Sequence, residues 1–158
     1  ETNLQKIIRE KYDGELLVGQ AAIVPVGKEN TDDLQDGPQA EERIPVKFLI
    51  YAPSMRSIGI ITNTLNAYLA FKAVILAISK HNRTPDVNKI RQVLVPGFGT
   101  GPGGMPKDRC AWQMLQAYET HALGKHRLRL VPTCLANVVT DEFKMLQVTF
   151  LDVEVLPS

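Results

Sequence analysis

A glycine-rich run constrains the fold of this chain more than any other feature. Five of its eleven glycines fall between Gly97 and Gly104. An apolar stretch, Ile90 to Val95, precedes the run, and a helical pattern, Lys107 to Ala122, follows it. Glycine turns with positive φ and lets a ligand approach the backbone closely. A helix N-terminus adds unpaired N–H groups and a partial positive charge. The order of strand, glycine loop and helix therefore predicts an α/β fold with a phosphate-binding loop.

Bulk properties predict one globular domain, residues 1–158. The hydrophobic fraction of 44% and charged fraction of 22% are ordinary for such a domain. The formal net charge of +1 gives no electrostatic reason to expect nucleic acid or a membrane as a partner. No apolar run approaches the roughly 18 residues of a membrane span. The two cysteines, Cys110 and Cys134, predict free thiols in a reducing compartment, so we expect a cytoplasmic protein.

Strand and helix patterns alternate along the chain, which predicts a mixed or parallel sheet with helices on its faces. The expected helices are Asn3–Tyr12, Asn63–His81 with Thr62 as N-cap, and Lys107–Ala122 with Ala111, Met114, Leu115, Tyr118 and Ala122 as its apolar stripe. The expected strands are Gln20–Val26, Val46–Ala52, Ile90–Val95, His126–Val131 and the β-rich Met145–Val155, while Leu135–Phe143 is ambiguous. Residues 27–45 are expected to form a flexible acidic loop.

The glycine loop matches neither of two common phosphate-binding motifs. Gly99-x-Gly101-x-x-Gly104 satisfies the dinucleotide pattern, but that pattern alone is a weak signal. Pro102 lies inside the turn, and no acidic residue ends the following strand to bind a ribose hydroxyl. The loop also lacks the Gly-Lys-Ser/Thr ending of a P-loop. A nicotinamide or flavin oxidoreductase is therefore the least favoured interpretation.

An ordered series of motifs resembles macro domains, in particular a bacterial and phage branch. The series, which covers about residues 3–120, comprises Gly19–Pro25, Phe48–Arg56, Asn66–Ala70, Val95–Gly101 with Gly103–Met105, Gln113-Met114 and Ala117-Tyr118. The resemblance implies a three-layer α/β/α domain with a mixed sheet that binds ADP-ribose. Some members of the family hydrolyse ADP-ribosyl groups from proteins, nucleic acid or small metabolites.

The resemblance also implies a binding site on the glycine loop. The candidate ligand-binding residues are Gly97, Phe98, Gly99, Thr100, Gly101, Pro102, Gly103, Gly104 and Met105. Gly99 to Met105 would wrap the diphosphate, with Met105 near the distal ribose. Arg56 is a further candidate because it ends a strand that should open on the same crevice, and a structural salt bridge is its alternative. Lys107, in the first turn of the next helix, is another candidate, with solvated surface charge as the alternative.

The strands that normally open a macro domain do not precede the matched part. Three explanations are open: the chain is a fragment complemented by another chain, its sheet is reduced, or it is circularly permuted. Met145–Val153 resembles the opening strand of this branch, displaced to the C-terminus. The expected partners are therefore ADP-ribose, an ADP-ribosylated protein or nucleic acid, and a complementing chain or a second copy.

No general base stands out, so the catalytic residues stay unassigned. The three histidines are scattered and no spacing indicates a metal site; no cofactor is expected besides the ligand ADP-ribose. Cys110 is expected to be a buried, unreactive cysteine, with a low-pKa thiol as the alternative. The functional hypotheses are an ADP-ribose binder that hydrolyses ADP-ribosyl bonds, a non-catalytic reader of ADP-ribosylation, and a structural or assembly protein that has lost the ligand.

Overall fold

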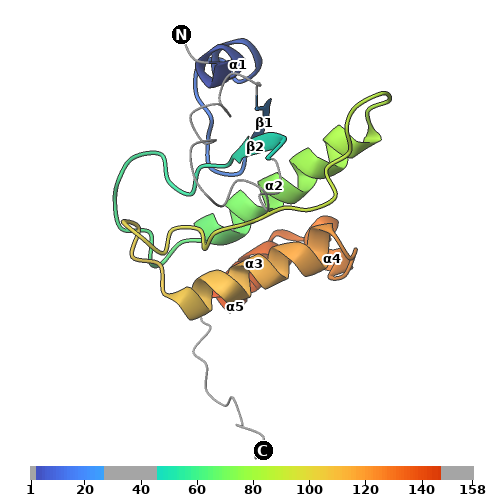
Figure 1. Ribbon diagram of the computed structural model, residues 1–158. Coiled ribbons are helices and arrows are strands. Elements are labelled where there is room, and N and C mark those ends of the chain that lie inside the picture. Colours follow the sequence, from blue (N-terminus) through green and yellow to red (C-terminus); the bar gives the residue numbers. More distant parts are fainter. Residues whose placement is uncertain (1–2, 27–45, 147–158) are drawn as a thin grey trace, which may run out of the picture.

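The computed structural model describes residues 3–26 and 46–146, which form helices and a small sheet (Figure 1). The elements are α1 (Asn3–Lys11), β1 (Ala22–Pro25), β2 (Phe48–Tyr51), α2 (Asn66–Arg83), α3 (Lys107–His121), α4 (Arg127–Leu130) and α5 (Leu135–Leu146). The expected mixture of helices and strands is confirmed at the level of an α/β class.

Strands β1 and β2 form a two-stranded antiparallel sheet in which Ala22 lies opposite Tyr51 and Pro25 opposite Phe48. Ala22 and Val24 of β1 are buried, as expected where alternate side chains of a strand face the core. Helix α1 is tied to the start of β1, because the Tyr12 hydroxyl donates a hydrogen bond to the Ala21 carbonyl at 2.7 Å. Since Ala22 and Val24 are buried and Ile23 between them is only half-buried, one face of the sheet packs against the interior.

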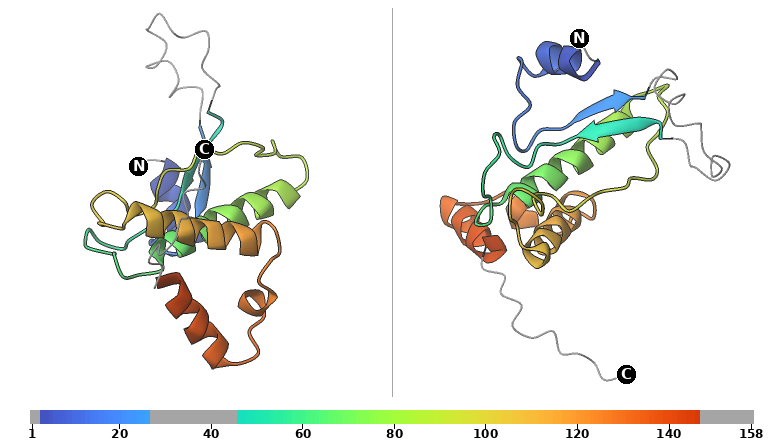
Figure 2. Two further views of the ribbon diagram at one scale, coloured as in Figure 1. Left: turned by 90° about the horizontal axis from the view of Figure 1, so that it is seen from below. Right: turned by 60° about the vertical axis from the view of Figure 1, so that its left-hand side comes forward.

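Helix α2 lies between the sheet and α3 (Figures 1 and 2). Its small residues Ala67, Ala70 and Ala73 are buried, and they allow the neighbouring elements to approach closely. One core cluster comprises Ile61, Ala67, Met105 and Cys110, and a second comprises Tyr68, Ala117 and Met145. Burial on two sides explains why the pattern of this helix is apolar nearly all round.

The N-terminus of α2 is capped from another helix. The Gln113 amide group, from α3, accepts a hydrogen bond from the Tyr68 N–H at 3.2 Å and donates to the Thr64 carbonyl at 2.8 Å. Thr62 is therefore not the N-cap, and its hydroxyl donates instead to the Gly104 carbonyl at 3.3 Å. The prediction was wrong because α2 begins at Asn66, three residues later than expected. Its first N–H, that of Asn66, donates to the Thr64 hydroxyl at 3.3 Å.

Two expected strands are absent from the part of the chain that the structure describes. Residues 90–95 have neither helix nor strand, and Arg127–Leu130 is a short helix, α4. The ambiguous segment 135–143 belongs to α5. Alternating apolar residues favour a strand only where a second strand is available to pair with them.

The buried face of α3 also differs from its expected apolar stripe. Leu115 and Tyr118 are 47% and 45% exposed. The buried residues of this helix are Cys110, Gln113, Gln116, Ala117 and Thr120. Two glutamines and a threonine face the core because each finds a hydrogen-bond partner there, which offsets the cost of burying polar groups.

The remaining sequence predictions lie largely outside the described residues. Met145 and Leu146 end helix α5, whereas residues 147–155 of the expected C-terminal strand are outside the described part. The acidic segment 27–45 is outside it as well.

Candidate functional site

The residues expected to bind phosphate form one loop, Gly97 to Met105. Two backbone hydrogen bonds close it. The Met105 N–H donates to the Gly99 carbonyl at 2.9 Å, and the Gly104 N–H donates to the Gly101 carbonyl at 3.0 Å. The loop is therefore a defined turn whose last two amides are used internally.

Close packing against Ile61 requires glycine at two positions of the loop. Gly99 has a φ of +73°, and a Cβ there would collide with Ile61 Cδ1. A Cβ on Gly103 would lie 2.7 Å from Ile61 Cγ1 and 2.8 Å from the Gly99 carbonyl oxygen. The Ile61 N–H also donates to the Gly103 carbonyl at 2.8 Å. These two glycines have a structural role whether or not a ligand binds.

The other amides of the loop decide how it can bind an anion. Pro102 has no N–H, and the Phe98 backbone lies near the Cys110 thiol, where it favours a lower pKa of that thiol. Gly103 is buried. Gly99, Thr100 and Gly101 are three consecutive residues, each at least partly exposed, whose amides have no hydrogen-bond partner among the described residues. The amide of the exposed Gly97 has none there either. Successive unpaired N–H groups in a turn are a common arrangement for binding anions.

Helix α3 begins directly after the loop, at Lys107. The positive end of its dipole therefore adjoins the loop. The Lys107 side chain is exposed and has no hydrogen-bond or ion-pair partner within residues 3–26 and 46–146. The Asp108 carboxylate accepts a hydrogen bond from the Arg109 N–H at 2.8 Å, so it stabilises the same helix end. Lys107 is the one charged candidate that the structure leaves next to the loop.

Two arginines near the loop are engaged with the protein itself. Arg109 Nη1 donates to the Thr62 carbonyl at 2.6 Å and to Asn63 Oδ1 at 2.9 Å, which fixes the segment before α2 against α3. Arg56 forms an exposed ion pair with Glu15, with Nε and Oε1 2.6 Å apart. The alternative raised for Arg56, a salt bridge, is the arrangement that the structure contains.

A cavity of about 370 Å³ adjoins the first part of the loop. Its walls are Ile50–Ala52 and Ser54 at the end of β2, Val74 of α2, and residues 93–99. Most of these side chains are apolar. The cavity therefore offers no charged group to a phosphate.

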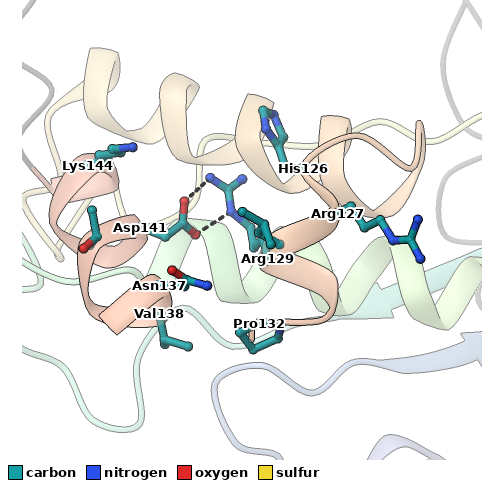
Figure 3. Close-up of a pocket in the computed structure, with 10 residues that line it drawn as sticks. His126, Arg127, Arg129, Pro132, Asn137, Val138, Asp141 and Lys144 are labelled. Atoms are coloured by element: carbon teal, nitrogen blue, oxygen red, sulfur yellow. Dashed lines mark hydrogen bonds and ion pairs between the residues drawn. The ribbon is translucent and has the colours of Figure 1, made fainter. Parts of the chain in front are cut away.

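A second cavity, of about 430 Å³, lies between α4 and α5, away from the glycine loop (Figure 3). Arg129 Nε and Nη2 each lie 2.5 Å from an oxygen of Asp141, and only 12% of the arginine side chain is exposed. Arg127, on the same short helix, points away from this ion pair. Because the Asp141 carboxylate neutralises the charge of Arg129, this cavity is a poor site for an anion.

The polar residues around Arg129 escaped the sequence prediction. Its Nη1 donates to Gln116 Oε1 at 3.1 Å and to Thr120 Oγ1 at 2.9 Å, and its guanidinium lies 5.8 Å from the centroid of the Tyr68 ring. The spacing of Gln113, Gln116 and Thr120 places all three on one face of α3. This helical spacing could have indicated a buried polar face on α3. The apolar residues of the same helix recur with an equally regular spacing, so the sequence alone did not show which face is buried.

Cys110 is buried, as expected for an unreactive cysteine, and burial raises the pKa of its thiol. Cys134 is exposed. We therefore expect a neutral alkylating reagent to label one thiol per native molecule, Cys134, and to label Cys110 only after unfolding. Mass spectrometry of peptides from the labelled native protein checks this. Rapid native labelling of Cys110 would instead support the low-pKa alternative.

His121 Nε2 lies 3.0 Å from the Tyr68 hydroxyl. Burial lowers the pKa of His121 below its usual 6.5, and the nearby charges of Lys72 and Arg129 lower it further. As the pH falls, the unfolded chain therefore takes up this proton before the folded chain does. The contribution of neutral His121 to the free energy of unfolding should be fully present above about pH 6.5. It should be lost as the pH drops toward the pKa of His121 in the folded state. Urea unfolding at several pH values should show this decline, and His121→Gln should flatten it.

Other classes of site find no support in the part of the chain described. No group of three or more histidine, cysteine, aspartate or glutamate side chains there could hold a metal ion. No helix there is both long enough and apolar enough to span a membrane. Comparison of the chain with protein-family models, curated proteins and solved structures returns no match. The geometry of the loop is therefore the main evidence on what the chain binds.

Proposed function

We propose that the chain binds ADP-ribose or a related nucleotide diphosphate through the glycine loop. The observation that carries the proposal is the set of three consecutive unpaired amides, Gly99 to Gly101, in a loop that internal hydrogen bonds and Ile61 hold in place. Donors that are already positioned need no ordering when the anion binds. The macro-like three-layer arrangement, a single domain and a cytoplasmic setting are parts of the same proposal.

A diphosphate suits the charges around this loop. Its negative oxygens would accept hydrogen bonds from the loop amides and lie near the positive end of α3. Lys107 would add a long-range attraction, weakened by solvent and by Asp108. Recognition would then depend mainly on backbone groups.

Binding without hydrolysis is the form of this function that the surrounding residues favour. The nearest carboxylate and thiol after the loop are those of Asp108, which accepts an amide hydrogen bond, and of Cys110, which is buried. Neither is a free base for activating water. A reader of ADP-ribosylated protein or nucleic acid therefore ranks above an ADP-ribosyl hydrolase.

Titration calorimetry with ADP-ribose tests the proposal directly. We expect saturable heat with ADP-ribose and with ADP, and none with ribose, which lacks phosphate. Incubation with an ADP-ribosylated protein should show binding while the label stays attached, whereas loss of the label would support the hydrolase. No heat at millimolar ADP-ribose would refute nucleotide binding and favour a structural or assembly role.

A further inference from the structure

The segment that follows α3 exposes much apolar surface. No residue between positions 123 and 144 is buried. Eight large apolar side chains in this segment are at least 43% exposed: Leu123, Leu128, Leu130, Val131, Leu135, Val138, Val139 and Phe143. Exposed apolar side chains that gather in one region mark a surface that binds another molecule.

The cavity between α4 and α5 is a groove in this surface. Leu128 of α4, Pro132 of the connecting segment and Val138 of α5 supply its apolar wall. Leu128 and Val138 are 59% and 45% exposed, so the groove is open to solvent. Its volume of about 430 Å³ is large enough to accept an apolar side chain of another protein.

The charged groups inside the groove are already paired. Arg129 forms its ion pair with Asp141, and His126 Nε2 lies 3.1 Å from Glu119 Oε2. An anion would therefore find no free charge inside the groove. An apolar group can pack against the wall without breaking either pair.

Two cations at the rim have no such partner. Arg127 and Lys144 both line the groove, and neither side chain forms an ion pair or a hydrogen bond with any residue in 3–26 or 46–146. Figure 3 shows them on opposite sides of the groove. Glu142 lies on the other side of α5 from Lys144, because positions two apart on a helix are about 200° apart. The rim therefore carries two positive charges around an apolar centre.

We propose that this groove docks a short segment of a partner protein in which a large apolar side chain lies between acidic residues. The apolar side chain would enter the groove and provide most of the affinity. The acidic residues would approach Arg127 and Lys144, which would select the partner and speed its association. The inference does not depend on the proposed function, because the groove lies away from the glycine loop.

Selection from a random peptide library displayed on phage, with the full chain as target, tests the proposal. We expect the enriched peptides to share a large apolar residue flanked by Asp or Glu. Synthetic copies in which alanine replaces that apolar residue should bind at least about ten-fold more weakly. Val138→Asp should weaken binding of the original peptides by a similar factor, because it places a negative charge in the wall. Protection of the Cys110 thiol verifies that the variant is folded.

A reversal of the rim charges provides the sharper control. With Arg127→Glu and Lys144→Glu together, selection should enrich basic residues around the same apolar residue. Lys80→Glu with Arg91→Glu makes the same change in net charge at exposed positions that do not line the groove. This second variant should bind the acidic peptides as the unmodified chain does.

Several results would overturn the proposal. One is a selection that does not enrich acidic residues around an apolar one. Another is equal binding of the enriched peptides to Val138→Asp, or continued selection of acidic peptides by the charge-reversed variant. A dimer that sedimentation detects and Val138→Asp dissociates would assign the groove to a second copy. ADP-ribose enters none of these measurements, so their failure would leave the proposed function untouched.

Discussion

Replacing Arg129 with methionine should lower the free energy of unfolding by about 3 kcal/mol. The side chain is 12% exposed and donates to both oxygens of Asp141. It also donates to Gln116 and Thr120, so one substitution removes a partner from a carboxylate and from two polar side chains. The Thr120 hydroxyl keeps its hydrogen bond to the Gln116 carbonyl at 2.7 Å. Methionine keeps much of the apolar stem, so the loss reports on the charged group. Urea denaturation followed by circular dichroism measures it.

Two further variants separate the ion pair from simple packing. Arg127→Met changes the same residue type on the same helix, but its side chain points away from the pair, so we expect a change within about 0.5 kcal/mol. The double variant Arg129→Met with Asp141→Leu should recover part of the loss, because no unpaired charge remains. An equal loss in Arg127→Met, or no recovery in the double variant, would contradict this account.

Residues 90–95 differ most clearly from what their sequence predicts. Their composition predicts a strand, and the prediction was wrong: a strand requires a hydrogen-bonded neighbour, and none lies beside them in the described part. Helices α2 and α3 were predictable because their periodicity is local, and their observed bounds differ little from the expected ones. Helix α4 was not predictable, because its position depends on the pairing of Arg129 with Asp141, twelve residues later in the chain.

At the candidate site, too, the local feature was predictable from the sequence, whereas the features that depend on distant contacts were not. The glycine loop was recognisable from its sequence, because clustered glycines signal an unusual turn. The sequence did not indicate which amides form hydrogen bonds inside the turn, because that depends on the fold. The amides of Gly104 and Met105 pair with carbonyls of their own loop. The reason for glycine at positions 99 and 103 lies in Ile61, about forty residues earlier in the chain.

Gly101→Val should reduce the affinity for ADP-ribose by about 100-fold while the fold persists. A Cβ at Gly101 meets no other atom within 4 Å, and its φ lies outside the left-handed region. The substitution therefore changes the free energy of unfolding by about 0.5 kcal/mol at most. The branched side chain would occupy the space that the phosphate needs next to the unpaired amides. Calorimetry measures the affinity and urea denaturation the stability.

The matched control is Gly59→Val, because Gly59 also has an ordinary φ and its Cβ would meet a single atom, at 4.0 Å. It lies outside the loop, so ADP-ribose should bind this variant with unchanged affinity. Gly103→Val is not a usable test, because its Cβ would press on Ile61 and on the Gly99 carbonyl and distort the loop itself. Unchanged affinity in Gly101→Val, with wild-type binding intact, would show that the ligand binds elsewhere. A fall shared by Gly59→Val would show that the effect is not specific to the three amides.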